Sequence, residues 1–290
     1  MEASLLYPSK CILAEGPYWH AKWNSFLWVD IEKGTLYRYD WAKKKVKTWD
    51  FPHRLSLVLE GKGDGLILAL DARLARFDPD TENLTWLVDI ETEKPLNRCN
   101  DGACDASGRL WVGTMSTQFD KNAGALYCVD TDFTLTKKVA SVTISNGIAW
   151  SLDHKTMYYI DTPTKSVQAF GYEVKTGDIS YIKEAITIPE GMGSPDGMCL
   201  DEKGHLWIAH YGGSGVYCWD PGSGKLLDKI EVPAPHVTSC AFGGSEGNQL
   251  LITTARENMI DAQLEEFPDS GSVFAVPMPV KGSPVYGCAF

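Results

Sequence analysis

The sequence predicts an all-β protein built as a six-bladed β-propeller, and three observations carry this prediction. Helical periodicity is scarce, and short apolar runs rich in Val, Ile, Trp and Tyr are interrupted about every ten residues by Gly, Pro, Asn or Asp. One type of strand occurs six times, each time followed by a second strand whose Leu or Val recurs every 38 to 57 residues. A four-stranded blade needs roughly 40–50 residues, so six blades fill residues 1–290 as a single domain.

The six copies are recognised by their apolar cores and by the short turns around them. The repeated strands are FLWVDI (26–31), LILALD (66–71), LWVGTM (110–115), MYYIDT (157–162), LWIAHY (206–211) and LLITTA (250–255). A β-sandwich also accommodates short alternating strands, but the sixfold count argues against it. The one segment with a plausible helical turn, 257–267, is predicted to be a loop insertion in the last blade with its acidic residues in solvent.

Charge and composition exclude several classes of partner. The net charge of −11 disfavours binding to nucleic acid or to an anionic membrane. The N-terminal segment has no signal-peptide pattern and no apolar run reaches 18 residues, so a cytoplasmic protein is expected. The eight cysteines form no CxxC pair and several lie in apolar strands, which predicts buried free thiols. The oligomeric state is left open.

A polar residue stands directly before glycine in four of the segments that precede the repeated strands. Residues just ahead of those strands should converge at one end of a propeller's central channel. Three clustered carboxylates repel by about 4 kcal/mol per pair at 4 Å and an effective dielectric of about 20. A divalent cation would neutralise them, and carboxylate and amide oxygens suit Ca²⁺, Mg²⁺ or Mn²⁺. The aligned residues are Glu15, Asp101, Asn146 and Asp196, with Asn100 one position earlier. The alternative is that these dipeptides are ordinary tight turns.

Longer motifs at the same places carry a family resemblance. They are AEGPYW, NRCNDGACDASGRLWVGTM, ISNGIAWSLDHKTMYYIDT, SPDGMCLDEKGHLWIAHY and VTSCAFGG. With them the chain resembles the SMP-30/gluconolactonase/luciferin-regenerating-enzyme family along nearly its whole length. The resemblance implies a propeller that binds one divalent cation through Glu15, Asn146 and Asp196, with Asp196 also accepting and donating a proton. It further implies that Arg98 and Asn100 bind substrate.

The activity that the resemblance implies is hydrolysis of a small sugar lactone to its aldonic acid. Asp196 is the expected base, Asp101 is a possible supporting group, and the metal could be Ca, Mn, Zn, Mg or Fe. Gln118 stands where animal members carry a substrate-contacting Glu, so the hydroxyl pattern of the preferred sugar is open. Two other functions remain: phosphotriester or fluorophosphate hydrolysis, since a metal can also polarise a phosphoryl oxygen, and a non-catalytic calcium-binding propeller.

Overall fold

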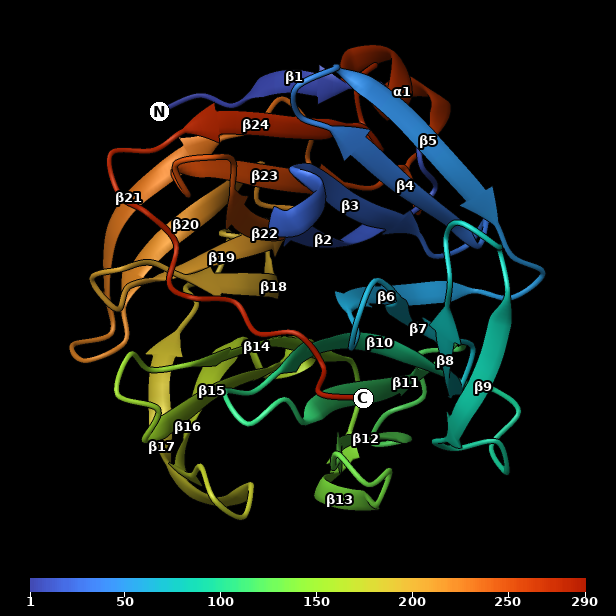
Figure 1. The fold of residues 1–290 in the computed structure, drawn as a ribbon. Helices are drawn as coiled ribbons and strands as arrows, with labels where there is room; N and C mark the ends of the chain where they lie inside the picture. The colour runs from blue at the N-terminus through green and yellow to red at the C-terminus, as the bar shows by residue number, and fades with distance from the viewer.

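The computed structural model describes the whole chain, Met1–Phe290, as six four-stranded antiparallel sheets around a central axis (Figure 1). This arrangement confirms the predicted six-bladed propeller. In five of the sheets the four strands follow one another along the chain, from the channel to the rim.

The strand bounds follow the chain blade by blade. Blade 1 holds β2 (Ala14–His20), β3 (Ser25–Asp30), β4 (Thr35–Asp40) and β5 (Lys45–Asp50). Blade 2 holds β6 (Leu55–Glu60), β7 (Leu66–Leu70), β8 (Arg73–Phe77) and β9 (Leu84–Asp89). Blade 3 holds β10 (Asn97–Cys104), β11 (Leu110–Ser116), β12 (Gly124–Val129) and β13 (Leu135–Val142). Blade 4 holds β14 (Ser145–Trp150), β15 (Thr156–Asp161), β16 (Ser166–Glu173) and β17 (Asp178–Thr187). Blade 5 holds β18 (Ser194–Leu200), β19 (Leu206–Tyr211), β20 (Gly215–Asp220) and β21 (Lys225–Glu231).

The sixth blade is assembled from both ends of the chain. It contains β22 (Val237–Gly243), β23 (Gln249–Thr254) and β24 (Val273–Pro277), and its outermost strand is β1 (Ser4–Tyr7). β1 pairs antiparallel with β24, so the N-terminus closes the ring beside the C-terminal blade (Figure 1).

The six repeated strands of the sequence are the second strands of the blades, not the innermost ones. The innermost strand of each blade is the polar segment that precedes the repeat, such as β2 or β18. In blade 2, whose innermost segment the sequence leaves unclear, LSLVLE forms β6. The candidate ligands therefore lie within the innermost strands, which line the channel, and not in loops that precede the repeated strands.

The core lies between neighbouring blades. Every residue of β3 and β7 is buried, because both faces of a second strand pack against adjacent sheets. Trp28 and Trp111 are fully buried and fill this interblade space. Outer strands such as β17 are mostly exposed.

Helix is limited to three short pieces. The single α-helix, α1 (Asp261–Glu266), lies between β23 and β24, where the sequence predicts an insertion. Two 3-10 turns, Ala21–Trp23 and Thr162–Thr164, follow β2 and β15. None of these helices has the length and apolarity needed to cross a membrane. All eight cysteines are free thiols, as predicted, and all are buried except Cys199, which is half-buried.

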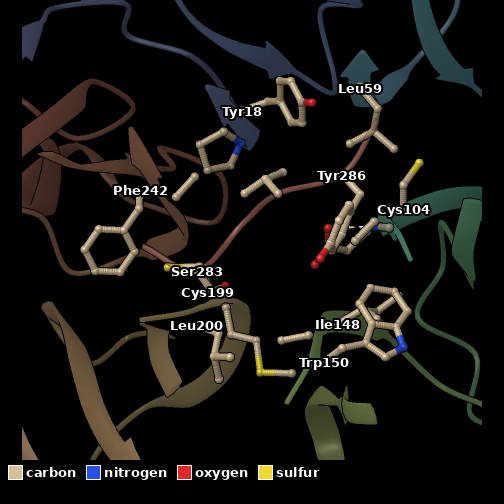
Figure 2. Close-up of a pocket in the computed structure, with 18 of the residues that line it drawn as sticks. Tyr18, Leu59, Cys104, Ile148, Trp150, Cys199, Leu200, Phe242, Ser283 and Tyr286 are labelled. Carbon is tan, nitrogen blue, oxygen red and sulfur yellow. Dashed lines mark hydrogen bonds between the residues drawn. The ribbon is translucent and has the colours of Figure 1, made fainter. Parts of the chain in front are cut away.

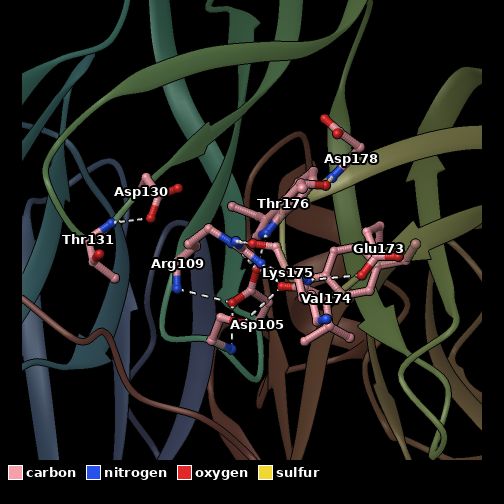
Figure 3. A network of polar contacts seen from close by, with 12 residues as sticks. Asp105, Arg109, Asp130, Thr131, Glu173, Val174, Lys175, Thr176 and Asp178 are labelled. Atoms are coloured by element: carbon pink, nitrogen blue, oxygen red, sulfur yellow. Dashed lines mark hydrogen bonds and ion pairs between the residues drawn. The ribbon is translucent and has the colours of Figure 1, made fainter.

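A buried ionic network joins blades 3 and 4 (Figure 3). Asp105, in the turn after β10, accepts hydrogen bonds from Arg109 Nε at 2.9 Å, Trp111 Nε1 at 3.0 Å and Tyr172 Oη at 2.6 Å. Arg109 in turn donates to the carbonyl oxygens of Val174 and Lys175 in the β16–β17 turn. These bonds satisfy both charges inside the protein and hold the two hairpins together.

Candidate functional site

The candidate site is built at an irregularity that all six innermost strands share. Each strand shifts register against its neighbour at one level of the channel, for example between Glu15 and Tyr18 in β2 and between Pro195 and Met198 in β18. A β-bulge leaves residues unpaired and re-aims their side chains. The remaining shifts are at Leu55/Leu57, Cys99/Gly102, Asn146/Ile148 and Val237/Ser239.

The bulges place the predicted polar residues along the channel wall. Glu15, Asn146 and Asp196 come from blades 1, 4 and 5, and each is buried. Asp101, from blade 3, is half-buried and lies close enough for its charge to act on both other carboxylates. Four positions far apart in the sequence thus meet in one acidic pocket.

Burial disfavours the ionised form of the three carboxyl groups in this pocket, and repulsion by neighbouring carboxylates adds to the effect at Glu15 and Asp196. Burial and then the charge of Asp101 raise the pKa of Glu15 from 4.5 to about 8. Burial raises the pKa of Asp101 from 3.8 to about 6. Burial, Glu15 and Asp101 together raise the pKa of Asp196 well above its ordinary value. Like charges in a desolvated site favour protons or a cation.

Asp196 provides the clearest sign that a cation fits. Its Oδ1 is buried and has no hydrogen-bond partner in the protein. Buried carboxylate oxygens are rarely left without a partner. A divalent cation held by oxygen ligands would satisfy this atom and offset the surrounding charge.

The orientation of the Asn146 amide is determined by its neighbours. Thr162 Oγ1 lies 2.9 Å from the Pro195 carbonyl oxygen, which can only accept, so the hydroxyl donates there. The same hydroxyl then accepts from Asn146 Nδ2 at 2.9 Å. The amide oxygen, Oδ1, is therefore the atom that faces Asn100 and the polar pocket.

Arg98 and Asn100 are joined to that pocket by a chain of hydrogen bonds. Arg98 Nη1 donates to the Asn100 Oδ1 at 2.5 Å and to the Cys99 carbonyl at 3.0 Å. Asn100 Nδ2 donates to the Ser145 carbonyl at 2.8 Å and to Asn146 Oδ1 at 3.3 Å. Both side chains are buried, so the guanidinium is held in one position beside the carboxylates.

Glu91, another buried acid, anchors the start of β10, next to Arg98. Glu91 accepts from Asn97 Nδ2 and Tyr127 Oη, each at 2.7 Å, and from Lys94 Nζ at 2.6 Å. The lowered pKa of Glu91 follows from these hydrogen bonds, which outweigh its burial. The strand end that carries Arg98 is therefore rigidly held.

Gln118 is not linked to this network. It follows β11, is exposed, and its backbone N–H donates to Ser116 Oγ at 3.1 Å. Its side chain makes no hydrogen bond to Arg98 or Asn100. The structure thus brings the other predicted site residues together, and Gln118 lies outside their hydrogen-bond network.

Glu257 is a site residue that the sequence analysis missed. The expectation that the acids of 257–267 face solvent is correct for Asp261, Glu265 and Glu266, which are exposed, but wrong for Glu257, which is half-buried. Its carbonyl accepts from Tyr211 Oη and His236 Nδ1, each at 3.0 Å, which ties this segment to the end of β19 and to the residue before β22. Burial raises the pKa of Glu257, and the Arg98 charge opposes that rise.

Another cluster of possible metal ligands is explained by the fold. The Asp201, His205 and Cys218 ligand atoms lie within 4.8 Å of one another. Asp201 already accepts from the His205 N–H at 2.9 Å and from Trp207 Nε1 at 3.0 Å, as Asp105 does in blade 3. Burial raises the pKa of Cys218 to about 12, which keeps its thiol protonated. This cluster braces a hairpin.

Below the carboxylates the channel becomes apolar (Figure 2). A cavity of about 190 Å³ begins at Gly16 and Asp101 and is lined mainly by hydrophobic side chains. Its far end is covered by the C-terminal segment, including Ser283 and Tyr286 (Figure 2). The same cavity thus extends from Gly16 and Asp101, beside the carboxylates, to the C-terminal segment.

Comparison with known proteins agrees with this architecture. The chain is 37% identical over 290 residues to an uncharacterized protein of Sulfolobus acidocaldarius, with 98% of this chain and 99% of that protein covered. It is 34% identical over 288 residues to regucalcin of Homo sapiens, with coverage of 97% and 96%. A solved structure described as a calcium-binding protein, regucalcin from Agrobacterium tumefaciens, superposes with a TM-score of 0.93 at 27% identity, covering 100% of this chain and 97% of that one.

Residues 13–256 match the family described as the SMP-30/Gluconolactonase/LRE-like region. This range contains every predicted ligand and substrate-binding residue, from Glu15 to Asp196. The chain belongs to the SMP-30/gluconolactonase/LRE-like family.

Proposed function

We propose that this protein is a divalent-metal-dependent lactonase that hydrolyses a sugar lactone to the aldonic acid. The observation that carries the proposal is the buried Asp196 Oδ1, which has no protein partner in a pocket of three mutually repelling carboxylates. Membership of a family that includes gluconolactonases supports the reaction class. The calcium-binding description of a structural relative supports the cation.

Glu15, Asn146 and Asp196 would hold the cation, with Asn146 offering the Oδ1 that Thr162 turns toward the pocket. When bound, the cation polarises the lactone carbonyl and so stabilises the negative charge of the transition state. The oxygen-only ligand set accommodates Ca²⁺, Mn²⁺, Mg²⁺, Zn²⁺ or Fe²⁺.

The remaining steps belong to side chains of the chain itself. Arg98 presents a planar fork of donors that can hold two oxygens of a polyhydroxy lactone, and Asn100 keeps that fork in place. Asp196 takes a proton from the attacking water and returns it to the leaving ring oxygen. Asp101, which shares the pocket, supports the charge balance.

The test is a pH-stat assay with five- and six-carbon aldonolactones, performed with metal and with chelator. We expect activity with metal, its loss on chelation and its recovery on readdition of metal. Asp196→Asn should lower kcat by at least about 100-fold, because it removes the base. Arg98→Lys keeps the charge but loses the fork, so it should mainly raise KM.

Three results would contradict the proposal. Activity that survives chelation removes the cation from the reaction. Hydrolysis of phosphotriesters without hydrolysis of lactones identifies a phosphotriesterase. Cation binding with neither activity identifies a non-catalytic calcium-binding propeller.

A further inference from the structure

The C-terminal segment Pro279–Phe290, here called the strap, crosses the central channel and lines its cavity through residues 283–286 (Figures 1 and 2). Its backbone is bound to several blades in turn. The Ser283 N–H donates to the Leu200 carbonyl at 2.9 Å, and the Cys288 N–H donates to the Glu60 carbonyl at 2.7 Å. The strap thus ties blade 5 to blade 2 beneath the cavity.

The strap also carries side-chain anchors. Tyr286 pairs with Cys104 in an isolated bridge, and its hydroxyl lies 3.2 Å from His154 Nε2 in blade 4. The ring of Phe290 packs against Phe133 with centroids 5.1 Å apart. These contacts hold the last residues of the chain in register with the end of β10.

Two thiols meet where the strap crosses blade 3. Cys104 is the last residue of β10 and Cys288 is the third residue from the C-terminus, and both are buried. Their Sγ atoms lie 2.6 Å apart, closer than two unbonded sulfur atoms normally approach. Neither thiol has another hydrogen-bond partner, and the backbone bonds on both sides keep the sulfurs from separating.

We propose that Cys104 and Cys288 form a disulfide that fastens the strap across the channel. This proposal is independent of the lactonase proposal, because neither residue belongs to the polar pocket. The bond would link positions 184 residues apart and so would restrict the unfolded chain strongly.

The oxidant is a low-molecular-weight disulfide, acting by thiol–disulfide exchange. One protein thiolate attacks the oxidant, forms a mixed disulfide and releases one small thiol. The second protein thiolate then attacks the mixed disulfide, forms the Cys104–Cys288 bond and releases the second small thiol. Two electrons pass to the oxidant, and the protons of the two protein thiols end on the released thiols.

A nearby pair of cysteines provides an internal control. The Sγ atoms of Cys199 and Cys240, which also line the cavity, are 3.6 Å apart. Cys240 Sγ lies 3.2 Å from the Trp207 carbonyl and can donate its hydrogen there. Both residues lie in blade strands, β18 and β22, so this pair is expected to remain reduced.

The experiment treats the full-length protein with oxidised glutathione, with and without urea below the unfolding transition, which lets the strap open transiently. Intact mass and non-reducing peptide mapping should show a loss of about 2 Da located at Cys104–Cys288, with the Cys199–Cys240 pair reduced. The oxidised protein should have a Tm higher by roughly 5–10 °C, a gain that dithiothreitol reverses. Cys288→Ser and Cys199→Ser serve as matched variants, and only the first should abolish the Tm gain.

The proposal is overturned if neither condition yields the link, if glutathione stays attached to Cys288, or if the cross-link forms elsewhere. Because the mass and mapping are measured on the wild-type chain, the result does not depend on the folding of either variant.

Discussion

At the residue scale, one hydroxyl determines what the site can bind. Thr162 Oγ1 donates to the Pro195 carbonyl and therefore accepts from the Asn146 amide nitrogen. Without this contact the amide could turn its NH₂ toward the carboxylates, and an NH₂ group cannot ligate a cation. A residue outside the ligand set thus selects the ligand atom.

The first prediction concerns that hydroxyl. Thr162→Val keeps the shape but removes the hydroxyl, and we expect divalent-cation affinity to fall by roughly 10- to 100-fold. Thr162→Ser keeps the hydroxyl and should bind nearly as wild type. Isothermal titration calorimetry with Ca²⁺ and Mn²⁺ measures both, and equal affinities in the two variants would show that Thr162 does not orient Asn146.

The second prediction concerns the pH dependence of the metal-free protein. The pKa of Glu15 in the folded state is about 8, against an ordinary value of 4.5. Between these values the folded state keeps a proton that the unfolded chain has lost. The free energy of unfolding should therefore decrease as pH rises from about 4.5 to about 8.

Urea unfolding in the presence of a chelator, repeated at intervals across this pH range, measures the slope. Glu15→Gln removes one of the three carboxyls with a raised pKa and should make the slope smaller, while Asp101 and Asp196 still contribute. A stability that rises with pH in the chelated wild-type protein would contradict the assigned direction of the pKa shift.

At the element scale, the innermost strands of blades 4, 5 and 6 approach each other so closely that glycine is required after Asn146 and after Asp196. A Cβ on Gly197 would lie 2.0 Å from Ser239 Oγ in blade 6, and a Cβ on Gly147 would lie 2.8 Å from the Asp196 carbonyl. Neither glycine has a positive φ, so the requirement is one of space. Gly147 and Gly197, which suggested tight turns in the sequence, are therefore contact points between blades.

The third prediction tests this close approach. Gly197→Ala should lower the free energy of unfolding by about 1–3 kcal/mol through overpacking against Ser239. Adding Ser239→Gly removes the obstructing side chain and should restore much of the loss, so the two changes should not be additive. Chemical unfolding of the two single variants and the double variant gives the coupling, and strict additivity would locate the cost elsewhere.

At the scale of the whole molecule, the ring is closed twice by the ends of the chain. β1 completes the blade that contains β24, and the Met1 carbonyl accepts from the Glu231 N–H at 2.9 Å. The strap crosses the channel and lines its cavity. The pairing of β1 with β24 therefore resists opening of the ring, and the strap restricts access to the cavity.

The fourth prediction concerns the N-terminal closure. Deletion of residues 1–8 should remove about 3–5 kcal/mol from the free energy of unfolding, because several backbone hydrogen bonds are lost. It should also promote concentration-dependent association, since β24 becomes an exposed edge strand. Calorimetry and light scattering check the two effects, and an unchanged Tm would mean that β1 is dispensable for closure.

The sequence alone was sufficient to predict the number of blades and most of the polar pocket. The repeated strands and the polar residue before each glycine are local patterns, so they can be recognised without knowing what they contact. Counting them predicted six sheets, and aligning them brought together Glu15, Asp101, Asn146 and Asp196. The family resemblance added Arg98 and Asn100, which the structure places in the same hydrogen-bonded network.

Only the tertiary structure decided which strands line the channel, which atom of Asn146 faces the pocket and how the ring closes. It also showed that Glu257 is half-buried, where the sequence predicted solvent exposure, and that Cys104 lies beside Cys288. Each of these features depends on contacts between residues far apart in the chain. Such contacts leave no periodic trace in the sequence, because their geometry exists only once the six blades have packed around one axis.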